Sequence, residues 1–160
     1  EYIYDPDGTY GVRSSEAVTE LCHGSINISS QFLSAPLMQN VIGDTHFAER
    51  DRMGRLMVFM ANLALPITGI GVDEATAIYF DHLGHGVVDG AGEVYVLKED
   101  AQSQRTQTTC GQAVVFEDLL RYRLSAGDYF DMRSSDSNVT PKRIGINGNN
   151  SKFYINSPYR

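Results

Sequence analysis

Apolar residues recur at spacings of three and four through the middle of the chain, which predicts one amphipathic helix over residues 48–63. Asp44 or Thr45 is expected to cap the start of this helix, and Pro66 to close it. The apolar face consists of Met53, Leu56, Met57, Met60 and Leu63.

Short apolar runs flank this helix and predict strands. Residues 38–43 fit the end of a buried strand, and residues 67–72 and 76–80 fit two more. Strand, helix and strand in this order form the unit of an α/β sheet, in which sites gather at the carboxyl ends of strands. His46 follows the first strand and Glu74 follows the second, so the two side chains are expected to meet.

The remaining segments are polar before this unit and rich in β signals after it. Residues 1–20 are expected to be loop-like, with a turn at Asp5–Gly8 and a short helix opening at Ser14. After residue 80 we expect hairpins at 86–89 and 93–97, and a polar loop at 102–109. Residues 113–124 are expected to form a short strand followed by a helical turn, and residues 152–155 an edge strand.

Length and composition describe one globular domain and exclude several partners. The chain has 160 residues, of which 42% are hydrophobic and 21% charged. A net charge of −7 argues against nucleic acid and against a basic membrane-binding face. The longest apolar stretch, residues 56–67, is interrupted by Asn62 and Pro66 and is too short to span a bilayer. We therefore expect neither a nucleic acid nor a membrane as partner.

Two features favour a secreted, processed glycoprotein. The sequence starts at Glu1 without a leader, which is typical of a trimmed product, and it carries sequons at Asn27, Asn138 and Asn149. Cys22 and Cys110 can pair with each other, tether a second chain, or remain reduced, and the sequence leaves these alternatives open.

The segment after the first strand concentrates residues that carry chemistry. His46 is followed by Arg50, Arg52 and Arg55, and Asp73 and Glu74 end the next strand. A hydroxyl nucleophile needs a base, and that base needs an acid to orient it, while guanidinium groups pair with carboxylates. Two spaced histidines, His82 and His85, lack further ligands, so no metal is expected.

These segments, Gly43-Asp-Thr-His-Phe-Ala-Glu-Arg-Asp-Arg-Met-Gly-Arg-Leu56 and Gly69-Ile-Gly-Val-Asp-Glu-Ala-Thr-Ala77, resemble the cyanophycinase and aspartyl dipeptidase group of serine peptidases, peptidase family S51. The resemblance implies an α/β fold, a three-layer α/β/α sandwich of the class I glutamine amidotransferase-like type. The chain would be the C-terminal part of one such domain, with an N-terminal segment (1–30), a strand-helix-strand core (31–80) and a β-rich extension (81–160).

The same resemblance implies roles for individual residues. It makes His46 the general base and Glu74 its orienting acid, with Asp73 as the alternative acid. Asp44, Thr45, Arg50, Arg52 and Arg55 are expected to bind substrate, and no cofactor is implied.

The nucleophile elbow of the family, a Gly-x-Ser-x-Gly-like turn, does not occur in this sequence. We expect the serine on a missing or separate N-terminal chain of the same precursor, which would be the main partner beside a homo-oligomer. The assembled protein would then hydrolyse aspartyl peptides, including β-aspartyl-arginine. The alternatives are a secreted, non-enzymatic storage, matrix or binding protein on the same fold, and a carboxylate-binding protein that uses only the arginines.

Overall fold

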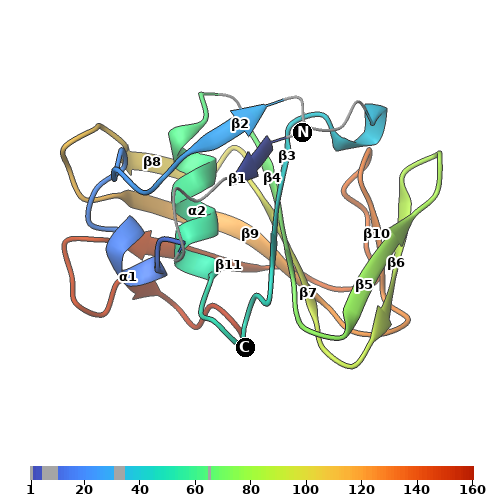
Figure 1. Ribbon diagram of the computed structural model, residues 1–160. Helices are drawn as coiled ribbons and strands as arrows, with labels where there is room; N and C mark the ends of the chain where they lie inside the picture. Colours follow the sequence, from blue (N-terminus) through green and yellow to red (C-terminus); the bar gives the residue numbers. More distant parts are fainter. Residues whose placement is uncertain (1, 5–10, 31–34, 65) are drawn as a thin grey trace.

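A large mixed β-sheet runs through the molecule (Figure 1). The computed structural model describes residues 2–4, 11–30, 35–64 and 66–160, and the turn expected at Asp5–Gly8 lies outside them. In the described residues, nine strands form this sheet: β1 (Tyr2–Tyr4), β2 (Ile28–Ser30), β3 (Val41–Thr45), β4 (Thr68–Val72), β7 (Val94–Lys98), β8 (Gln104–Gln107), β9 (Val115–Leu124), β11 (Lys142–Asn147) and β12 (Tyr154–Ile155).

The strand order of this sheet is β12-β11-β9-β7-β4-β3-β1-β2, and β8 pairs with β9. The pairs β1–β3 and β3–β4 are parallel, whereas the pairs outside this centre are antiparallel. The described chain is therefore a mixed α/β structure that is mostly sheet, with its parallel strands in the region of the two motifs.

Helix α2 (Met53–Asn62) connects β3 to β4 and confirms the predicted strand-helix-strand unit. It packs against one face of the large sheet beside the short helix α1 (Ser14–Ala17). Residues 53–61 of α2 are buried, since the sheet lies on one side of the helix and α1 and the chain ends cover it further. The predicted apolar face of the helix is thus part of the main core.

The start of α2 differs from the prediction, because the helix begins at Met53 and residues 47–51 form turns. Phe47 is fully buried and its backbone N–H bonds to the Val72 carbonyl at 3.2 Å, which holds the chain against the end of β4. Both His46 and Asp51 have positive φ angles, of 46° and 48°, and a residue in this conformation cannot continue a right-handed helix. Likewise β3 begins at Val41, after a 3₁₀ turn at Pro36–Met38.

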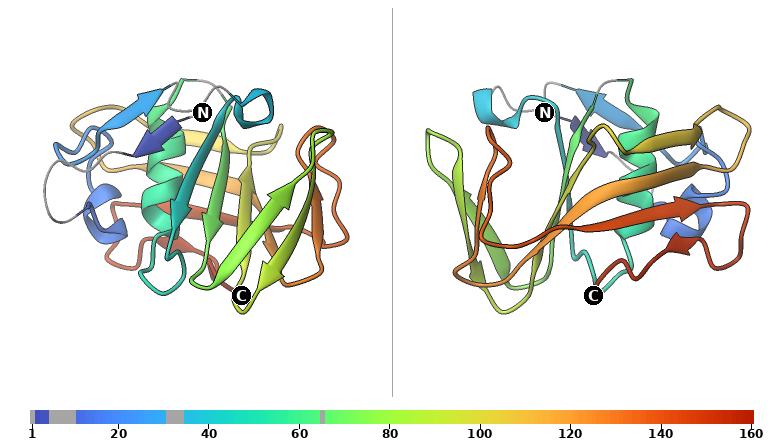
Figure 2. Two further views of the ribbon diagram at one scale, coloured as in Figure 1. Left: turned by 45° about the vertical axis from the view of Figure 1, so that its right-hand side comes forward. Right: turned by 180° about the vertical axis from the view of Figure 1, so that it is seen from behind.

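The other face of the large sheet carries a smaller sheet of three strands, in the order β10-β6-β5 (Figure 2). These strands are β5 (Thr76–Phe80), β6 (His85–Gly90) and β10 (Tyr129–Asp131). A second hydrophobic cluster, which includes Val88, Val96 and Phe130, fills the space between the two sheets. In the described residues this face is therefore covered by strands, where an α/β/α sandwich has helices.

Two predictions for the second half of the chain were wrong. Residues 113–124 contain the long strand β9 rather than a strand and a helical turn, and residues 104–107 of the expected loop form β8. Asp118 has a positive φ of 57° within β9, and the pairing register of β9 with β11 shifts nearby. This bulge places the buried Phe116 and Leu119 three residues apart, a spacing that imitates a helix.

Cys22 and Cys110 form a disulfide bond across 88 residues of sequence. It joins the loop after α1 to the loop after β8, so it connects the N-terminal segment to the β-rich part. The three sequon asparagines are exposed. The side chain of Asn138 is engaged, however, since it accepts a hydrogen bond from the Tyr129 N–H at 2.9 Å and donates one to Asp128 at 2.7 Å.

Candidate active site

His46 and Glu74 meet at the carboxyl edge of the two parallel strands. Thr45 at the end of β3 pairs with Val72 at the end of β4, so the residues that follow these strands leave the sheet side by side. The Nδ1 atom of His46 lies 2.7 Å from Oε1 of Glu74, and the two side chains are 46% and 53% exposed. An acid at Nδ1 holds the imidazole in the tautomer whose Nε2 can accept a proton.

The backbone around this pair is constrained. His46 and Ala75 both adopt the left-handed conformation, at φ 46° and 51°, which non-glycine residues rarely do. Such strain persists where surrounding structure enforces it, and it clusters at functional sites. Glu49 contributes by accepting a hydrogen bond from the Glu74 N–H at 2.9 Å.

Asp73, the alternative acid, does not contact the histidine. Its carboxylate accepts hydrogen bonds from the Ala48 N–H at 2.8 Å and the Glu93 N–H at 3.1 Å, which joins the turn after β3 to the start of β7. Burial raises the pKa of Asp73, and these two backbone hydrogen bonds counteract the shift. The geometry therefore gives Asp73 a structural position and leaves Glu74 as the partner of His46.

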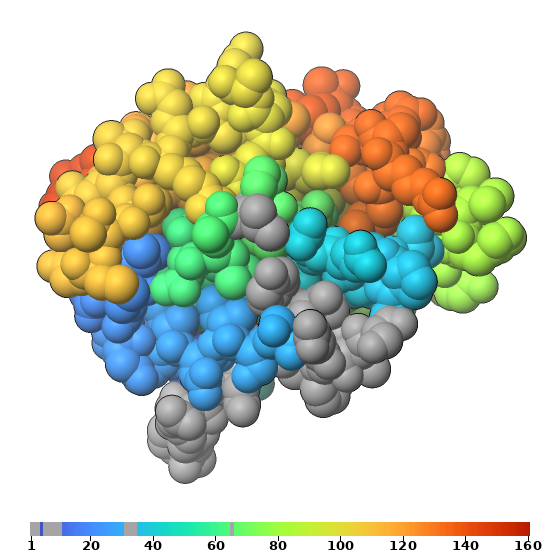
Figure 3. All heavy atoms as spheres, turned by 90° about the horizontal axis from the view of Figure 1, so that it is seen from above, coloured from blue at the N-terminus to red at the C-terminus, as the bar shows by residue number. Residues whose placement is uncertain are grey.

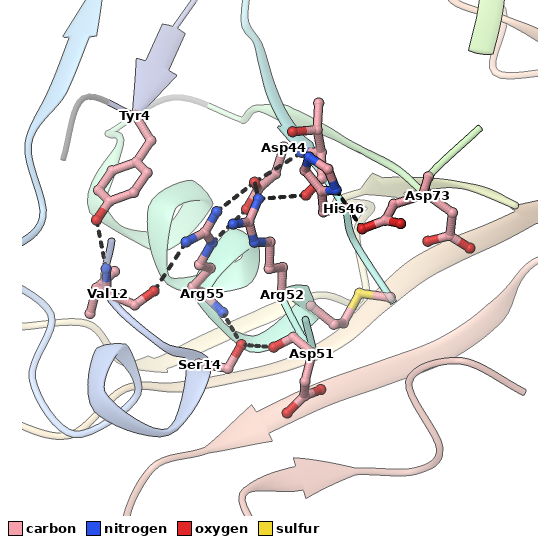
Figure 4. Close-up of polar contacts among 12 residues, drawn as sticks. Tyr4, Val12, Ser14, Asp44, His46, Asp51, Arg52, Arg55 and Asp73 are labelled. Atoms are coloured by element: carbon pink, nitrogen blue, oxygen red, sulfur yellow. Dashed lines mark hydrogen bonds and ion pairs between the residues drawn. The ribbon is translucent and has the colours of Figure 1, made fainter. Parts of the chain in front are cut away.

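The arginines that follow His46 fall into different environments (Figure 4). Arg55 is buried and forms a bidentate pair with Asp44, with Nε and Nη2 each 2.6 Å from a carboxylate oxygen. Its Nη1 donates to the Val12 carbonyl at 3.1 Å, and the guanidinium lies 5.2 Å from the ring centre of Tyr4. Asp44 and Arg55, both expected to bind substrate, are thus bonded to each other inside the protein.

Arg52 and Arg50 remain closer to solvent. Arg52 donates to the Thr45 carbonyl at 2.6 Å and to Asp44 at 3.3 Å, and burial together with neighbouring Arg55 lowers its pKa. Arg50 is exposed and forms no ion pair within the described residues. Arg50, Arg52 and Arg55 line a cavity of about 370 Å³ together with Arg13. This cavity presents positive charge to an anionic ligand.

Hydroxyl groups from distant segments cap the helix that carries Arg55, a feature that the sequence analysis missed. The free N–H groups of Met53, Gly54 and Arg55 donate to the hydroxyls of Tyr159, Tyr154 and Ser14, at 3.0, 3.1 and 3.0 Å. These three N–H groups lack partners within the helix, so the hydroxyls satisfy them. The local sequence before Met53 contains no such cap, and no sequence signal could reveal residues that lie about a hundred positions away.

Asp51 connects these hydroxyls. Its carboxylate accepts hydrogen bonds from Tyr154 at 2.6 Å and Tyr159 at 3.0 Å, and its backbone carbonyl accepts one from Ser14. Burial, followed by the hydrogen bond to Asp51, raises the pKa of Tyr154, and burial raises that of Tyr159 as well. Both hydroxyls therefore stay protonated and act as donors to Asp51 while they cap the helix.

The geometry of His46 and Glu74 matches two of the three parts of a nucleophilic triad. Within the described residues, Glu74 is the side-chain partner of His46, and no serine hydroxyl bonds to the imidazole. Ser14 lines the same cavity as the arginines, and its hydroxyl accepts a hydrogen bond from the Arg55 N–H and donates one to the Asp51 carbonyl. The described residues contain no group of three His, Cys, Asp or Glu side chains suited to a metal ion. Within the same residues, no helix combines the length and the hydropathy needed to cross a membrane.

Comparison with known proteins gives a partial likeness to cyanophycinases. The chain is 34% identical over 99 residues to cyanophycinase of Trichormus variabilis (strain ATCC 29413 / PCC 7937). The same identity and length hold for cyanophycinase of Nostoc sp. (strain PCC 7120 / SAG 25.82 / UTEX 2576). Each alignment covers 60% of this chain and 33% of the relative, so the chain spans about a third of the length of the curated relatives it matches. No family model matches the chain. The likeness is distant and partial, and it suggests a hydrolase related to peptidases.

Proposed function

We propose that this chain supplies the base and the orienting acid of a cyanophycinase-like serine peptidase that hydrolyses aspartyl peptide bonds. The observation that carries the proposal is the 2.7 Å contact between Nδ1 of His46 and Glu74, at the edge where two parallel strands end. Partial homology to cyanophycinase supports the same class of activity. The serine nucleophile would come from the N-terminal part of the precursor, as a missing or separate chain.

In this proposal His46 accepts the proton of the serine hydroxyl through Nε2, and Glu74 stabilises the imidazolium that forms. His46 then returns the proton to the leaving amine. The carboxylate of an aspartyl or β-aspartyl-arginine substrate would pair with Arg50 and with the outer nitrogen of Arg52, both of which line the cavity. Arg55 would act indirectly, because Asp44 already occupies two of its nitrogens.

The proposal extends to the architecture of the whole protein. Strand β2 forms one edge of the large sheet, next to the parallel strands. An N-terminal chain that adds parallel strands and helices to this sheet would complete a three-layer α/β/α sandwich. A companion chain or a second copy would then bury surface that is exposed in this chain.

A second candidate is a secreted protein of the same fold without catalysis. It is favoured by the disulfide, by the exposed sequon asparagines, and by the lack of a serine at His46 within the described residues. Intact mass spectrometry of native and then denatured material discriminates between the two. A companion chain with a serine elbow supports the peptidase, and an elbow without its serine supports the non-enzymatic protein.

The catalytic test replaces His46 in the assembled protein. His46→Asn keeps a residue type that tolerates the left-handed backbone, whereas His46→Ala removes the side chain altogether. Hydrolysis of β-aspartyl-arginine should fall by about 10⁴-fold or more in both variants. The exposed His82 offers the control, because His82→Ala should leave turnover unchanged. Equal turnover in all three variants would refute the role of His46.

A further inference from the structure

The small sheet carries an exposed apolar surface that the proposed active site does not use. Among the described residues, the exposed large hydrophobic side chains are Tyr79 (75% exposed), Leu83 (49%), Val87 (49%) and Tyr129 (40%). All four lie on the small sheet or in the β5–β6 turn, which form one end of the molecule (Figure 3). Scattered apolar residues are ordinary on a protein surface, but a group confined to one sheet face indicates a binding surface.

The sheet register places three of these side chains in one row. Tyr79 on β5 pairs with Val87 on β6, and Val87 pairs with Tyr129 on β10. Strands lie about 4.8 Å apart, so the two tyrosines flank Val87 at a separation of about 10 Å. The alternate residues Val88 and Phe130 are buried against the large sheet, so this row lies on the outer face. We call the row and its acidic neighbours the tyrosine face.

Carboxylates border the row on both sides. On one side His85 pairs with Asp131, with its Nε2 atom 3.0 Å from Oδ2, and its Nδ1 lies 3.5 Å from Asp81. On the other side Asp89 on β6 is exposed, opposite Ala77. Asp136 lies 3.5 Å from the hydroxyl of Tyr129.

Two carboxylates of this face, those of Asp81 and Asp131, are stabilised in their charged form. Backbone hydrogen bonds, first of all from the N–H of His85 and of Ser134, hold the pKa of Asp81 and of Asp131 below its usual range. Two cations lie near this face: the guanidinium of Arg133 is 3.5 Å from the His82 carbonyl, and Nζ of Lys98 is 2.7 Å from the Ser135 hydroxyl. The four carboxylates outnumber these two cations, so the formal charge of the tyrosine face is negative.

We propose that the tyrosine face binds a cationic peptide that presents arginine side chains. A guanidinium is planar, so it can stack on the exposed ring of Tyr79 or Tyr129. Adjacent rows on a strand lie about 6.8 Å apart, which brings the N–H groups of a stacked guanidinium within reach of a neighbouring carboxylate. The face thus combines the two interactions that recognise arginine better than lysine.

Charge argues against a second copy of the chain as the occupant. The protein carries a net charge of −7, and self-association through this face would bring its carboxylates against those of the copy. The inference rests on the small sheet alone and does not require that the chain hydrolyse peptides. Loss of hydrolysis in a His46 variant therefore says nothing about it, and the two proposals can fail separately.

The experiment measures binding of an acetylated, amidated hexa-arginine peptide to the intact protein by isothermal titration calorimetry. Loss of both rings in the double variant Tyr79→Ala/Tyr129→Ala should weaken binding by about tenfold, as expected for two exposed cation–π contacts. Tyr79→Phe/Tyr129→Phe keeps the rings and should bind like the unaltered protein. Hexa-lysine should bind several-fold more weakly than hexa-arginine, because an ammonium does not stack.

A second pair of variants tests the carboxylates. Asp89→Asn/Asp136→Asn should weaken hexa-arginine binding and reduce its salt dependence, whereas Glu117→Gln on the large sheet should change neither. Equal affinity for hexa-arginine in the double alanine variant and the unaltered protein would overturn the proposal. So would a concentration-dependent dimer in sedimentation that the double alanine variant abolishes, since the face would then bind a second copy.

Discussion

The end of β3 contributes to two acid–base pairs of opposite character. Asp44 and Arg55 are buried and bonded at two points, whereas His46 and Glu74 are about half exposed and share one contact. Asp44 and His46 are neighbours at the end of β3, whereas their partners come from α2 and from the turn after β4. Their different burial separates a part that holds the site together from a part that is open to a substrate.

This difference explains why one motif contains so many charged residues. A buried ion pair is stable only when hydrogen bonds satisfy it fully, and Asp44 and Arg55 meet this condition with the help of Val12 and Arg52. A catalytic pair must instead leave atoms free for the reaction. Among the arginines of the motif, Arg50 and the outer nitrogen of Arg52 also have donor atoms without a hydrogen bond in the described residues.

The largest effect is expected from breaking the buried pair. Arg55→Ala leaves the Asp44 carboxylate buried without its partner, and the free energy of unfolding should fall by about 3–5 kcal/mol. Chemical denaturation measures this loss. The matched control is the exposed Arg50, where Arg50→Ala should change stability by less than about 0.5 kcal/mol. A similar small loss in both variants would show that the buried pair is not the stabilising element.

Changing the exposed pair of His46 and Glu74 should alter activity rather than stability. Glu74→Gln keeps the side-chain shape but removes the charge that stabilises a protonated His46, so kcat of the assembled protein should fall by about 10²-fold. The free energy of unfolding should change by less than about 0.5 kcal/mol, since exposed ion pairs contribute little. Steady-state kinetics and denaturation of the same sample test both halves. Lost stability with unchanged kcat would reverse the assignment.

A smaller effect is expected at the helix cap that supports the buried pair. Tyr154→Phe removes the hydroxyl that accepts from the Gly54 N–H and donates to Asp51, which should cost about 1–2 kcal/mol of unfolding free energy. Tyr79→Phe is the matched control, because Tyr79 is 75% exposed. If the two substitutions have equal effects, the tyrosine cap does not stabilise α2.

The smallest effect is expected at an exposed ion pair. Arg143 lies 2.6 Å from Asp100, and its hydrogen bond to the carboxylate lowers the pKa of Asp100 to about 2 from 3.8. A depressed carboxyl pKa stabilises the fold above the ordinary value, and this contribution disappears as the pH falls towards 2. The Tm difference between the protein and Asp100→Asn should be small at pH 6 and vanish near pH 2. A Tm difference that does not change with pH would contradict the lowered pKa of Asp100.

Local pattern was enough to predict the central unit of the fold, and the family resemblance implied the residues of the candidate site. The spacing of Leu56, Met57 and Met60 revealed the face of α2, and the strand ends revealed that His46 and Glu74 would be neighbours. The start of α2 was predicted five residues early, since nothing local shows that Phe47 is drawn into the core. Strand β9 was not predicted in full, because the bulge at Asp118 interrupts the alternation of buried and exposed residues that reveals a strand.

By itself, the sequence determined the apolar face of α2 and the strand ends at which His46 and Glu74 stand, because periodicity and spacing are properties of the chain. Only the tertiary structure decided which arginines are buried in ion pairs and which face solvent. Burial of Arg55 depends on Asp44, Val12 and Ser14, and the cap of its helix depends on tyrosines at the other end of the chain. These contacts arise when distant segments exclude water together, and no pattern within a short window contains them.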